Sequence, residues 1–384
     1  MLLRSRRYVS PLVLLAAITL AVALALAGAP PSSVAATSKA STASAWQFAP
    51  PFDNGRTSAS SVRIRNRVYL IGGYSYDSVA QQLNIYNDVQ WATLRHDGGI
   101  SGGWHQTTPF NVPRLGQTAA RYGNYVYVIA GGDASFAYLD DVQIARVGDD
   151  GNITADGWRT SPYHLHHARA AASSDVITID GTPYLYVIGG AGSDASGNTI
   201  HFADVEYARI NAADGSIGPW TLDPSQFAKP RSSMTTAFVQ RCLYVVGGFG
   251  DALTDIFADT QYSCVHADGS LGPWHTSPNS MQQSRYGAEM VVVRNADGSA
   301  RFIVLGGNHG GGTYLNEVEQ TTVTGAGGNS PWTVAPSSSF LPDAQWGQTG
   351  VLFGGNVYVL GGVLRSQEYL NRTIYAPVDD LFPR

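Results

Sequence analysis

A pair of glycines recurs six times in this chain at a nearly constant spacing of about 58 residues. Each pair ends a short run of β-branched and aromatic residues, which is typical of a strand buried on both faces of a sheet. The glycines let the backbone turn where a Cβ would clash. A fixed period of this size indicates a repeat array rather than one irregular core. The six pairs are Gly72-Gly73, Gly131-Gly132, Gly189-Gly190, Gly247-Gly248, Gly306-Gly307 and Gly361-Gly362.

Each repeat carries the same order of strand and turn signals. In the second repeat we predict strands over residues 115–122, 125–130 and 140–147, and a fourth strand around Trp158. Asp150-Gly151 lies between the third and fourth strands, and Asp-Gly between alternating segments is a strong hairpin signal. Four antiparallel strands per repeat, repeated radially, predict an all-β, six-bladed β-propeller over residues 45–384.

The tryptophans indicate how the ring closes. The sixth glycine pair is followed only by a third-strand segment over residues 372–378, whereas Trp46-Gln47-Phe48 precedes the first complete strand set. We therefore predict that an N-terminal strand, residues 45–49, completes the sixth blade and removes two exposed edges. Five further tryptophans each fall 25 to 31 residues after a glycine pair, one per repeat, so we interpret them as packing residues between neighbouring blades: Trp104, Trp158, Trp220, Trp274 and Trp332.

The first residues have the pattern of a secretory leader. A positive segment with Arg4, Arg6 and Arg7 precedes an apolar stretch over residues 12–27 that ends in small residues. This predicts a signal peptide over residues 1–27 and a flexible Ser/Thr/Ala-rich spacer over 28–44. The alternative is an uncleaved membrane anchor, and the export route, general secretory or twin-arginine, stays open.

Composition narrows the class of partner. The formal net charge is −5 and no basic stripe is present, which argues against nucleic acid and anionic membrane surfaces as partners. We therefore expect a secreted or periplasmic protein, a monomer, whose mature domain does not insert into a membrane.

The order of motifs in each repeat resembles the kelch repeat, as found in bacterial exported proteins. In the third repeat it runs from Asp204-Val205-Glu206-Tyr207-Ala208 through Asp214-Gly215 to Trp220, and the resemblance covers about residues 46–378. It implies a propeller fold with diverse activities, since exported kelch-like proteins include a sialic-acid mutarotase and the copper enzyme galactose oxidase. Galactose oxidase fits poorly, because it has seven blades and needs a cysteine crosslinked to a tyrosine.

The two cysteines, Cys242 and Cys264, lie in the predicted second and third strands of the fourth blade. An exported protein reaches an oxidising compartment, where neighbouring cysteines form disulfides. The strand register decides between a disulfide and two buried thiols. The sequence leaves both alternatives open.

Strand order places the loops between second and third strands on the same face as the loops between blades. On this face the candidate ligand-binding residues are Tyr74, Tyr76, Tyr138, His201, His309 and Tyr314. Five blades also begin their inner strand with an arginine, where the sixth has Gln345: Arg56, Arg114, Arg169, Arg231 and Arg285. A residue that recurs once per repeat usually serves the repeat, which favours hydrogen bonds to loop carbonyls. The alternative is a ring of guanidinium groups that holds a carboxylate at the channel mouth.

The run His164-Leu165-His166-His167 has the residue type for zinc but not the number of ligands. A zinc site needs a third ligand, which His201 would supply only if adjacent loops converged. We favour a solvated loop, and we expect no metal and no cofactor. No serine lies in a recognisable nucleophile turn.

These observations predict a binding module that recognises a carbohydrate or protein ligand through the loop face. Aromatic rings beside carboxylates suit sugars and protein hot spots alike. The alternative is a non-redox enzyme, an isomerase or mutarotase acting on an acidic sugar, in which an arginine holds the sugar and a loop carboxylate moves a proton. A third alternative is a surface scaffold without a pocket.

Overall fold

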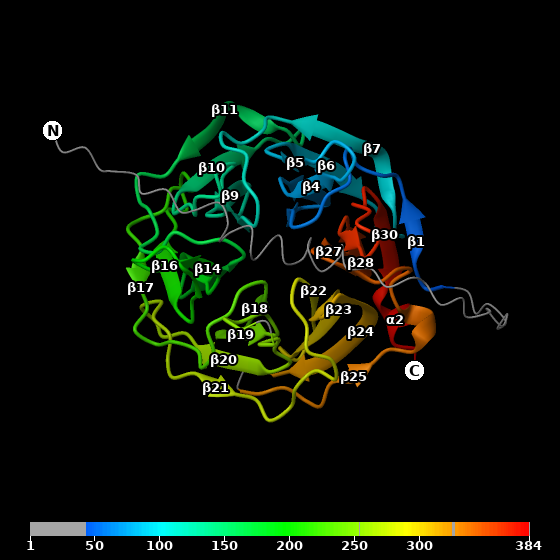
Figure 1. Cartoon of the computed structure of the whole chain (residues 1–384). Helices are drawn as coiled ribbons and strands as arrows, with labels where there is room; N and C mark the ends of the chain where they lie inside the picture. Colours follow the sequence, from blue (N-terminus) through cyan, green and yellow to red (C-terminus); the bar gives the residue numbers. More distant parts are fainter. Residues whose placement is uncertain (1–43, 253, 325–326, 384) are drawn as a thin grey trace.

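Six four-stranded antiparallel sheets are arranged in a ring about a central axis (Figure 1). The computed structural model describes residues 44–252, 254–324 and 327–383. The architecture confirms the predicted six-bladed β-propeller. The expected signal peptide, residues 1–27, and the expected spacer up to residue 43 lie outside the described residues.

The blades are numbered here in chain order, and the strands of each are given from the channel outward. Blade 1 contains β2 (Ser60–Ile64), β3 (Arg67–Ile71), β6 (Val89–Leu94) and β7 (Ile100–Thr107). Blade 2 contains β8 (Thr118–Tyr122), β9 (Tyr125–Ile129), β10 (Val142–Val147) and β11 (Ile153–Thr160). Blade 3 contains β12 (Ser173–Ile179), β13 (Thr182–Ile188), β16 (Val205–Arg209) and β17 (Thr221–Leu222).

The second half of the ring repeats this pattern. Blade 4 contains β18 (Thr235–Val239), β19 (Cys242–Val246), β20 (Thr260–Cys264) and β21 (His275–Thr276). Blade 5 contains β22 (Glu289–Arg294), β23 (Ala300–Gly310), β24 (Thr313–Val323) and β25 (Thr333–Val334). Blade 6 contains β27 (Thr349–Phe353), β28 (Asn356–Leu360), β30 (Thr373–Pro377) and β1 (Gln47–Ala49).

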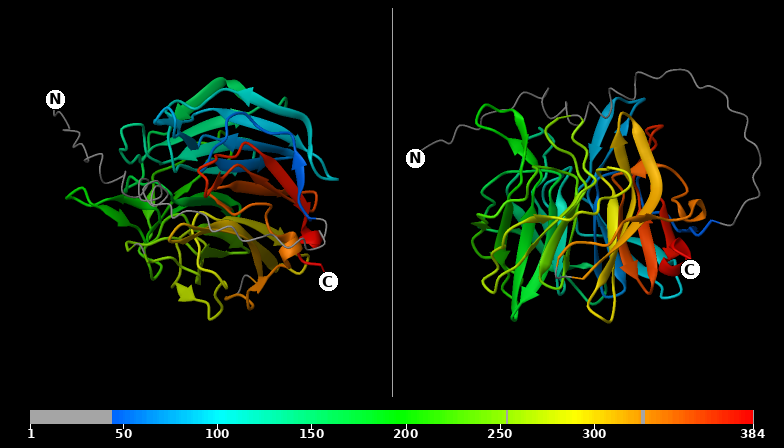
Figure 2. Two further views of the ribbon diagram at one scale, coloured as in Figure 1. Left: turned by 45° about the vertical axis from the view of Figure 1, so that its right-hand side comes forward. Right: turned by 90° about the horizontal axis from the view of Figure 1, so that it is seen from below.

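Short elements decorate the ring. Three two-stranded sheets add to the loops: β4 (Tyr74–Asp77) with β5 (Gln82–Ile85), β14 (Ala191–Ser193) with β15 (Thr199–His201), and β26 (Gln345–Trp346) with β29 (Val363–Leu364). A 3-10 turn, η1 (Ser337–Ser339), and a helical turn, α2 (Val378–Leu381), lie beside the closure. Figure 2 shows the connections between second and third strands, including the β4–β5 and β23–β24 hairpins, on one face of the ring, which we call the loop face. No helix among the described residues has the length and apolar character needed to span a bilayer.

The N-terminal strand closes the ring, as predicted. β1 pairs antiparallel with β30, with Phe48 opposite Ile374, so the chain ends share blade 6. Trp46, directly before β1, is 4% exposed and its indole N–H donates to the Ser339 carbonyl at 3.0 Å. It packs with Ile303 of blade 5 as well as with blade 6.

The five tryptophans that follow the glycine pairs also lie between neighbouring blades, which confirms their predicted role. Trp158 of blade 2 packs with Tyr69 of blade 1, and Trp220 of blade 3 packs with Tyr127 of blade 2. The remaining three tryptophans each join the apolar cluster shared with the preceding blade: Trp274, Trp332 and Trp104. Because each interface is filled by one large aromatic ring and strand residues, the inner strands are held at a fixed spacing around the axis.

The glycine motif turns the backbone through two left-handed positions. In blade 1 these are Gly72 at φ 59° and Gly73 at φ 94°, and a Cβ on Gly73 would approach the Thr57 carbonyl oxygen to 2.8 Å. In blade 2 the corresponding positions are Ala130 and Gly131, at φ 57° and 104°, rather than the Gly131-Gly132 pair of the sequence motif. At the first position a Cβ would also meet backbone in other blades, since on Gly189, Gly247 and Gly361 it would come to 2.7 Å from a carbonyl oxygen of the next blade.

Cys242 and Cys264 form a disulfide between β19 and β20. The two residues are directly opposite in the register, and the flanking pair is bonded from the Val265 N–H to the Arg241 carbonyl. The cysteines therefore occupy a non-hydrogen-bonded pair, where opposing residues of antiparallel strands come closest. A disulfide is compatible with an oxidising compartment.

Candidate functional site

The five repeated arginines are buried inside the blades. Each is at most 1% exposed. In blade 4, Arg231 donates to both carboxylate oxygens of Asp259 at 2.7 and 3.1 Å, and to the Gly247 carbonyl at 2.9 Å. The other four repeat this arrangement with an acid at or just before the third strand: Arg56 with Asp88, Arg114 with Asp141, Arg169 with Asp204 and Glu206, and Arg285 with Glu319.

Each ion pair links the segment that leads into the inner strand with the glycine turn and the third strand of the same blade. Burial alone would raise the pKa of Asp259, but the hydrogen bond and charge of Arg231 outweigh it and hold that pKa below its ordinary value. Blade 6 has Gln345 in place of the arginine. This side chain donates to the Gly361 carbonyl and accepts a hydrogen bond from Arg372. The structure thus places the arginine donors on protein acceptors.

The six loop residues predicted to bind a ligand do not come together in one site. Tyr74 and Tyr314 come together with other aromatic rings near the channel, as described below. Tyr76 lies beside Tyr369, because its backbone hydrogen-bonds to the Tyr369 phenol. The other three candidates have separate partners: Tyr138 lies near Thr199, His201 pairs with Asp251 at 2.8 Å, and His309 bonds the Ser284 carbonyl at 2.7 Å.

The histidine run is held by carboxylates. His164 bonds Asp140, His166 bonds Glu206 and His167 bonds Asp204, at 2.6 to 2.9 Å. His201 instead pairs with Asp251. Within residues 44–252, 254–324 and 327–383, no group of three or more His, Cys, Asp or Glu side chains is arranged to hold a metal ion.

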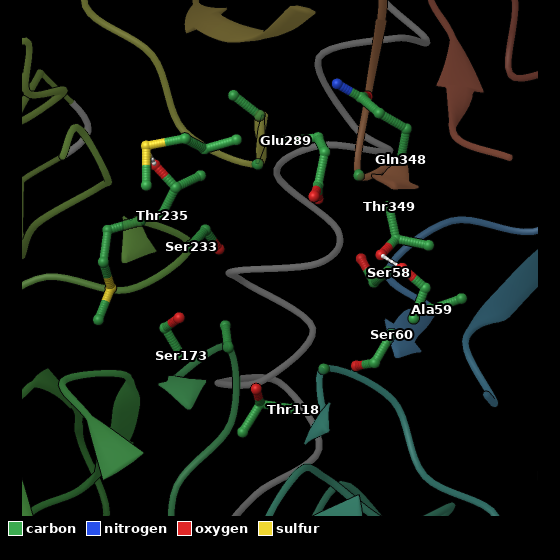
Figure 3. Close-up of a pocket in the computed structure, with 18 of the residues that line it drawn as sticks. Ser58, Ala59, Ser60, Thr118, Ser173, Ser233, Thr235, Glu289, Gln348 and Thr349 are labelled. Carbon is green, nitrogen blue, oxygen red and sulfur yellow. Dashed lines mark hydrogen bonds between the residues drawn. The ribbon is translucent and has the colours of Figure 1, made fainter. Parts of the chain in front are cut away.

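A cavity of about 260 Å³ lies on the ring axis, at the end of the inner strands where the loop face begins. All six blades contribute to it through residues 58–61, 116–119, 171–174, 233–236, 287–290 and 346–350. Its wall carries many hydroxyl groups, and Figure 3 shows Ser60, Thr118, Ser173, Thr235 and Thr349 around one space. We call it the channel cavity.

Pairs of hydroxyls join neighbouring blades at three of the six interfaces. Thr118 bonds Ser174 at 2.8 Å, Ser173 bonds Thr236 at 2.7 Å, and Thr349 bonds Ser61 at 2.8 Å. Thr235 has only long contacts, to the Val246 carbonyl at 3.4 Å and the Met290 sulfur at 3.7 Å. Because a hydroxyl has one donor and two acceptor sites, each keeps capacity for a further partner.

One blade breaks this pattern with a carboxylate. Opposite the residue before each glycine turn, the inner strand has a hydroxyl in five blades and Glu289 in blade 5. The five hydroxyl residues are Ser60, Thr118, Ser173, Thr235 and Thr349. The position follows the repeated arginine, or Gln345, by four residues in every repeat. That constant offset is the sequence signal that would have identified Glu289, which our sequence analysis missed.

Glu289 lies against a glycine of the neighbouring blade. Its neighbour across the blade 5–6 interface is Gly350, whose N–H bonds the carboxylate. A Cβ on Gly350 would lie 3.2 Å from the Glu289 Cγ, so a larger residue there would crowd this side chain. Burial raises the pKa of Glu289 well above its ordinary value, and the Gly350 hydrogen bond only partly opposes this. Among the described cavity-lining residues, Glu289 is the only ionisable one.

Blades 5, 6 and 1 contribute a group of aromatic rings, of which one belongs to the cavity wall. Trp346 lines the cavity, with Tyr286 at 5.9 Å and Tyr314 at 6.3 Å between ring centroids. Tyr74 and Tyr369 form a second pair at 6.2 Å. Burial raises the pKa of Tyr74, and the phenols of Tyr369, Tyr314 and Tyr286 raise it further. We call these five residues the aromatic arc.

A second buried carboxylate lies farther along β12. Asp175 accepts N–H bonds from Val176 and from Phe238 of blade 4. Burial raises its pKa to about 6, although these bonds and nearby arginine charges lower it. It joins two blades and does not line the channel cavity.

The sequence matches no protein-family model, and no curated protein is significantly similar to it.

Proposed function

We propose that the protein is an exported, kelch-like binding module that holds a carbohydrate in the channel cavity. The hydroxyl-lined cavity carries this proposal. Sugar hydroxyls donate and accept hydrogen bonds, and so do the serine and threonine hydroxyls of its wall. The cavity volume of about 260 Å³ is near the small end of ligand pockets, roughly 300–1,000 Å³, and suits one sugar ring better than a peptide.

The aromatic arc, through Trp346 on the cavity wall, is also suited to a sugar ligand. The aromatic arc offers ring faces on one side, and aromatic rings pack against the apolar faces of sugars. The arc is confined to three of the six blades, so a ligand would have one preferred orientation. A propeller with a rigid ring of inner strands is well suited to hold such a preformed site.

We favour a neutral or basic sugar over an acidic one. Arg114 and Arg231, which would attract an acidic sugar, are buried and paired with carboxylates. The ionisable group on the described cavity wall is Glu289, which would repel a carboxylate once ionised. The signal peptide predicted from the sequence over residues 1–27 and the disulfide together support an extracytoplasmic location.

A sugar isomerase remains the second candidate, and one observation favours it. Glu289 is a partly buried carboxyl with a raised pKa that lines a cavity, which is how a proton-transferring group is often tuned. Isomerisation also needs a group that accepts or returns a proton on the other side of the sugar. The described lining residues supply no second ionisable side chain, so we favour binding.

The test is a thermal-shift and calorimetric screen of the full chain against neutral, basic and acidic monosaccharides. A sugar at 100 times its dissociation constant should add about 2.7 kcal/mol to the free energy of unfolding. Thr235→Val removes a cavity hydroxyl that has only long contacts with the protein, and it should weaken sugar binding by up to about tenfold. The matched control is Thr221→Val on the exposed outer strand β17.

Either of two results would refute the proposal. One is that no monosaccharide shifts the melting temperature at millimolar concentration. The other is that sugar binds but Thr235→Val and Thr221→Val behave alike, which would place the sugar outside the channel cavity. Turnover of a bound sugar, followed by NMR, would instead support the isomerase.

A further inference from the structure

We propose that the sugar held in the channel cavity carries an ammonium group, which Glu289 pairs with and the aromatic arc encloses. This inference rests on the proposed function, because it concerns the ligand of the same cavity. It assigns the site to basic sugars, such as 2-amino sugars with a free amine, rather than to neutral or N-acylated ones.

The first argument is the placement of one carboxylate in a ring of hydroxyls. Five blades use Ser or Thr at this register position, and these residues serve the blade contacts. Glu289 makes no corresponding hydroxyl pair, and its partner position is the glycine Gly350. A repeat that needed only blade packing would have kept the hydroxyl, because a buried carboxylate is costly.

The second argument is that Glu289 lacks a protein cation. The buried acids Asp204, Glu206 and Glu319 each pair with a buried arginine. Among the described residues, no ion pair includes Glu289, and no Arg, Lys or His lines the cavity with it. Arg285, four residues earlier, is occupied by Glu319. A partly buried carboxylate without a protein cation is a site where a cationic ligand can form a charge-assisted pair.

The third argument is that the aromatic arc lies next to this carboxylate. The Trp346 ring is packed against the start of blade 5, since a Cβ on Gly287 would come within 2.8 Å of its Cε3 atom. Gly287 precedes Glu289 by two residues, and Tyr286, whose ring contacts Trp346, directly precedes Gly287. Carboxylate and aromatic rings therefore occupy the same side of the cavity.

An ammonium group fits this combination better than any neutral group. The faces of Trp and Tyr rings attract cations within about 6 Å, and this attraction grows when the cation leaves water. A carboxylate beside such rings supplies the balancing charge. The serine and threonine hydroxyls of the cavity wall would then bond the sugar hydroxyls. The charge of Glu289 would make the site selective for the amine.

The experiment compares matched sugars by calorimetry on the full chain. Glucosamine, galactosamine and mannosamine are each measured beside the parent sugar and its N-acetyl derivative. We expect at least one free amine to bind about tenfold or more tightly than both of its matched sugars, as a charge-assisted bond and cation–π contacts would give. Glu289→Gln, close in shape but neutral, should remove this preference and leave binding of the parent sugar within about threefold.

The outcomes separate this inference from the proposed function. If parent or N-acetyl sugars bind as tightly as the free amines, the ammonium assignment is wrong and the carbohydrate site stands. If Glu289→Gln keeps the preference for the amine, Glu289 is not the group that binds it and the inference fails. If none of the nine sugars binds, both the inference and the proposed function fail. A second variant, Trp346→Leu, should weaken binding of the amine more than binding of its parent sugar.

Discussion

The closure of the ring depends on Trp46, and its removal should have a large and measurable cost. Trp46 is 4% exposed and packs in the cluster that joins blades 5 and 6. Truncating a buried tryptophan to alanine costs about 3–5 kcal/mol. Trp46→Ala also leaves the Ser339 carbonyl without its indole donor, which adds about 1 kcal/mol. We therefore expect Trp46→Ala to lower the free energy of unfolding by about 5 kcal/mol.

The assay is urea unfolding of the full chain, followed by tryptophan fluorescence and circular dichroism. The matched control is Phe48→Ala on the same closing strand, where the ring is 64% exposed and truncation should cost less than about 0.5 kcal/mol. Deleting residues 45–49 should cost more than Trp46→Ala, because it also leaves β30 as an exposed edge that favours aggregation. If Trp46→Ala and Phe48→Ala lower stability equally, burial of Trp46 does not secure the closure.

Three further predictions concern buried pairs and the cavity carboxylate. Arg231→Met leaves Asp259 buried without its cation and should cost about 3–5 kcal/mol in urea unfolding, with sugar affinity unchanged. Replacing Cys242 and Cys264 by serine opens a loop with a sequence separation of 22 and should cost about 3 kcal/mol by the chain-entropy estimate, measured as the shift in urea midpoint without reductant. The raised pKa of Glu289 means that its contribution to stability is complete below about pH 4.5 and is lost as the pH rises through the folded-state pKa. Glu289→Gln should therefore become more stable relative to the native chain between pH 5 and pH 8.

Each of these has a control. Arg241→Met removes an exposed ion pair with Asp180 and should cost at most about 1 kcal/mol; a cost equal to that of Arg231→Met would contradict the argument from burial. Dithiothreitol should lower the stability of the native chain and leave the double serine variant unchanged. A stability difference between Glu289→Gln and the native chain that stays constant with pH would show that this carboxyl does not titrate abnormally.

The sequence determined the architecture because its signals are local. The glycine period, the strand runs and the tryptophan that follows five of the glycine pairs can each be counted within one repeat, and together they predicted the blades, the ring closure and the blade interfaces. Even the closure by residues 45–49 followed from counting strands, since only one blade lacked its outer strand. One detail differed: in blade 2 the left-handed pair is Ala130-Gly131 rather than Gly131-Gly132.

Tertiary structure decided what the side chains do. The sequence placed Arg231 at a strand entry, but its direction followed from Asp259, 28 residues away, which pairs with it inside the blade. The sequence did not decide whether Cys242 and Cys264 form a disulfide. The register between β19 and β20 places them directly opposite. In the sequence Glu289 is marked only by its offset of four residues from Arg285, where the other repeats have Ser or Thr. Only the ring brings it into a cavity beside Trp346, because blades far apart in the chain meet at the axis, and local patterns do not record which side chains face that shared space.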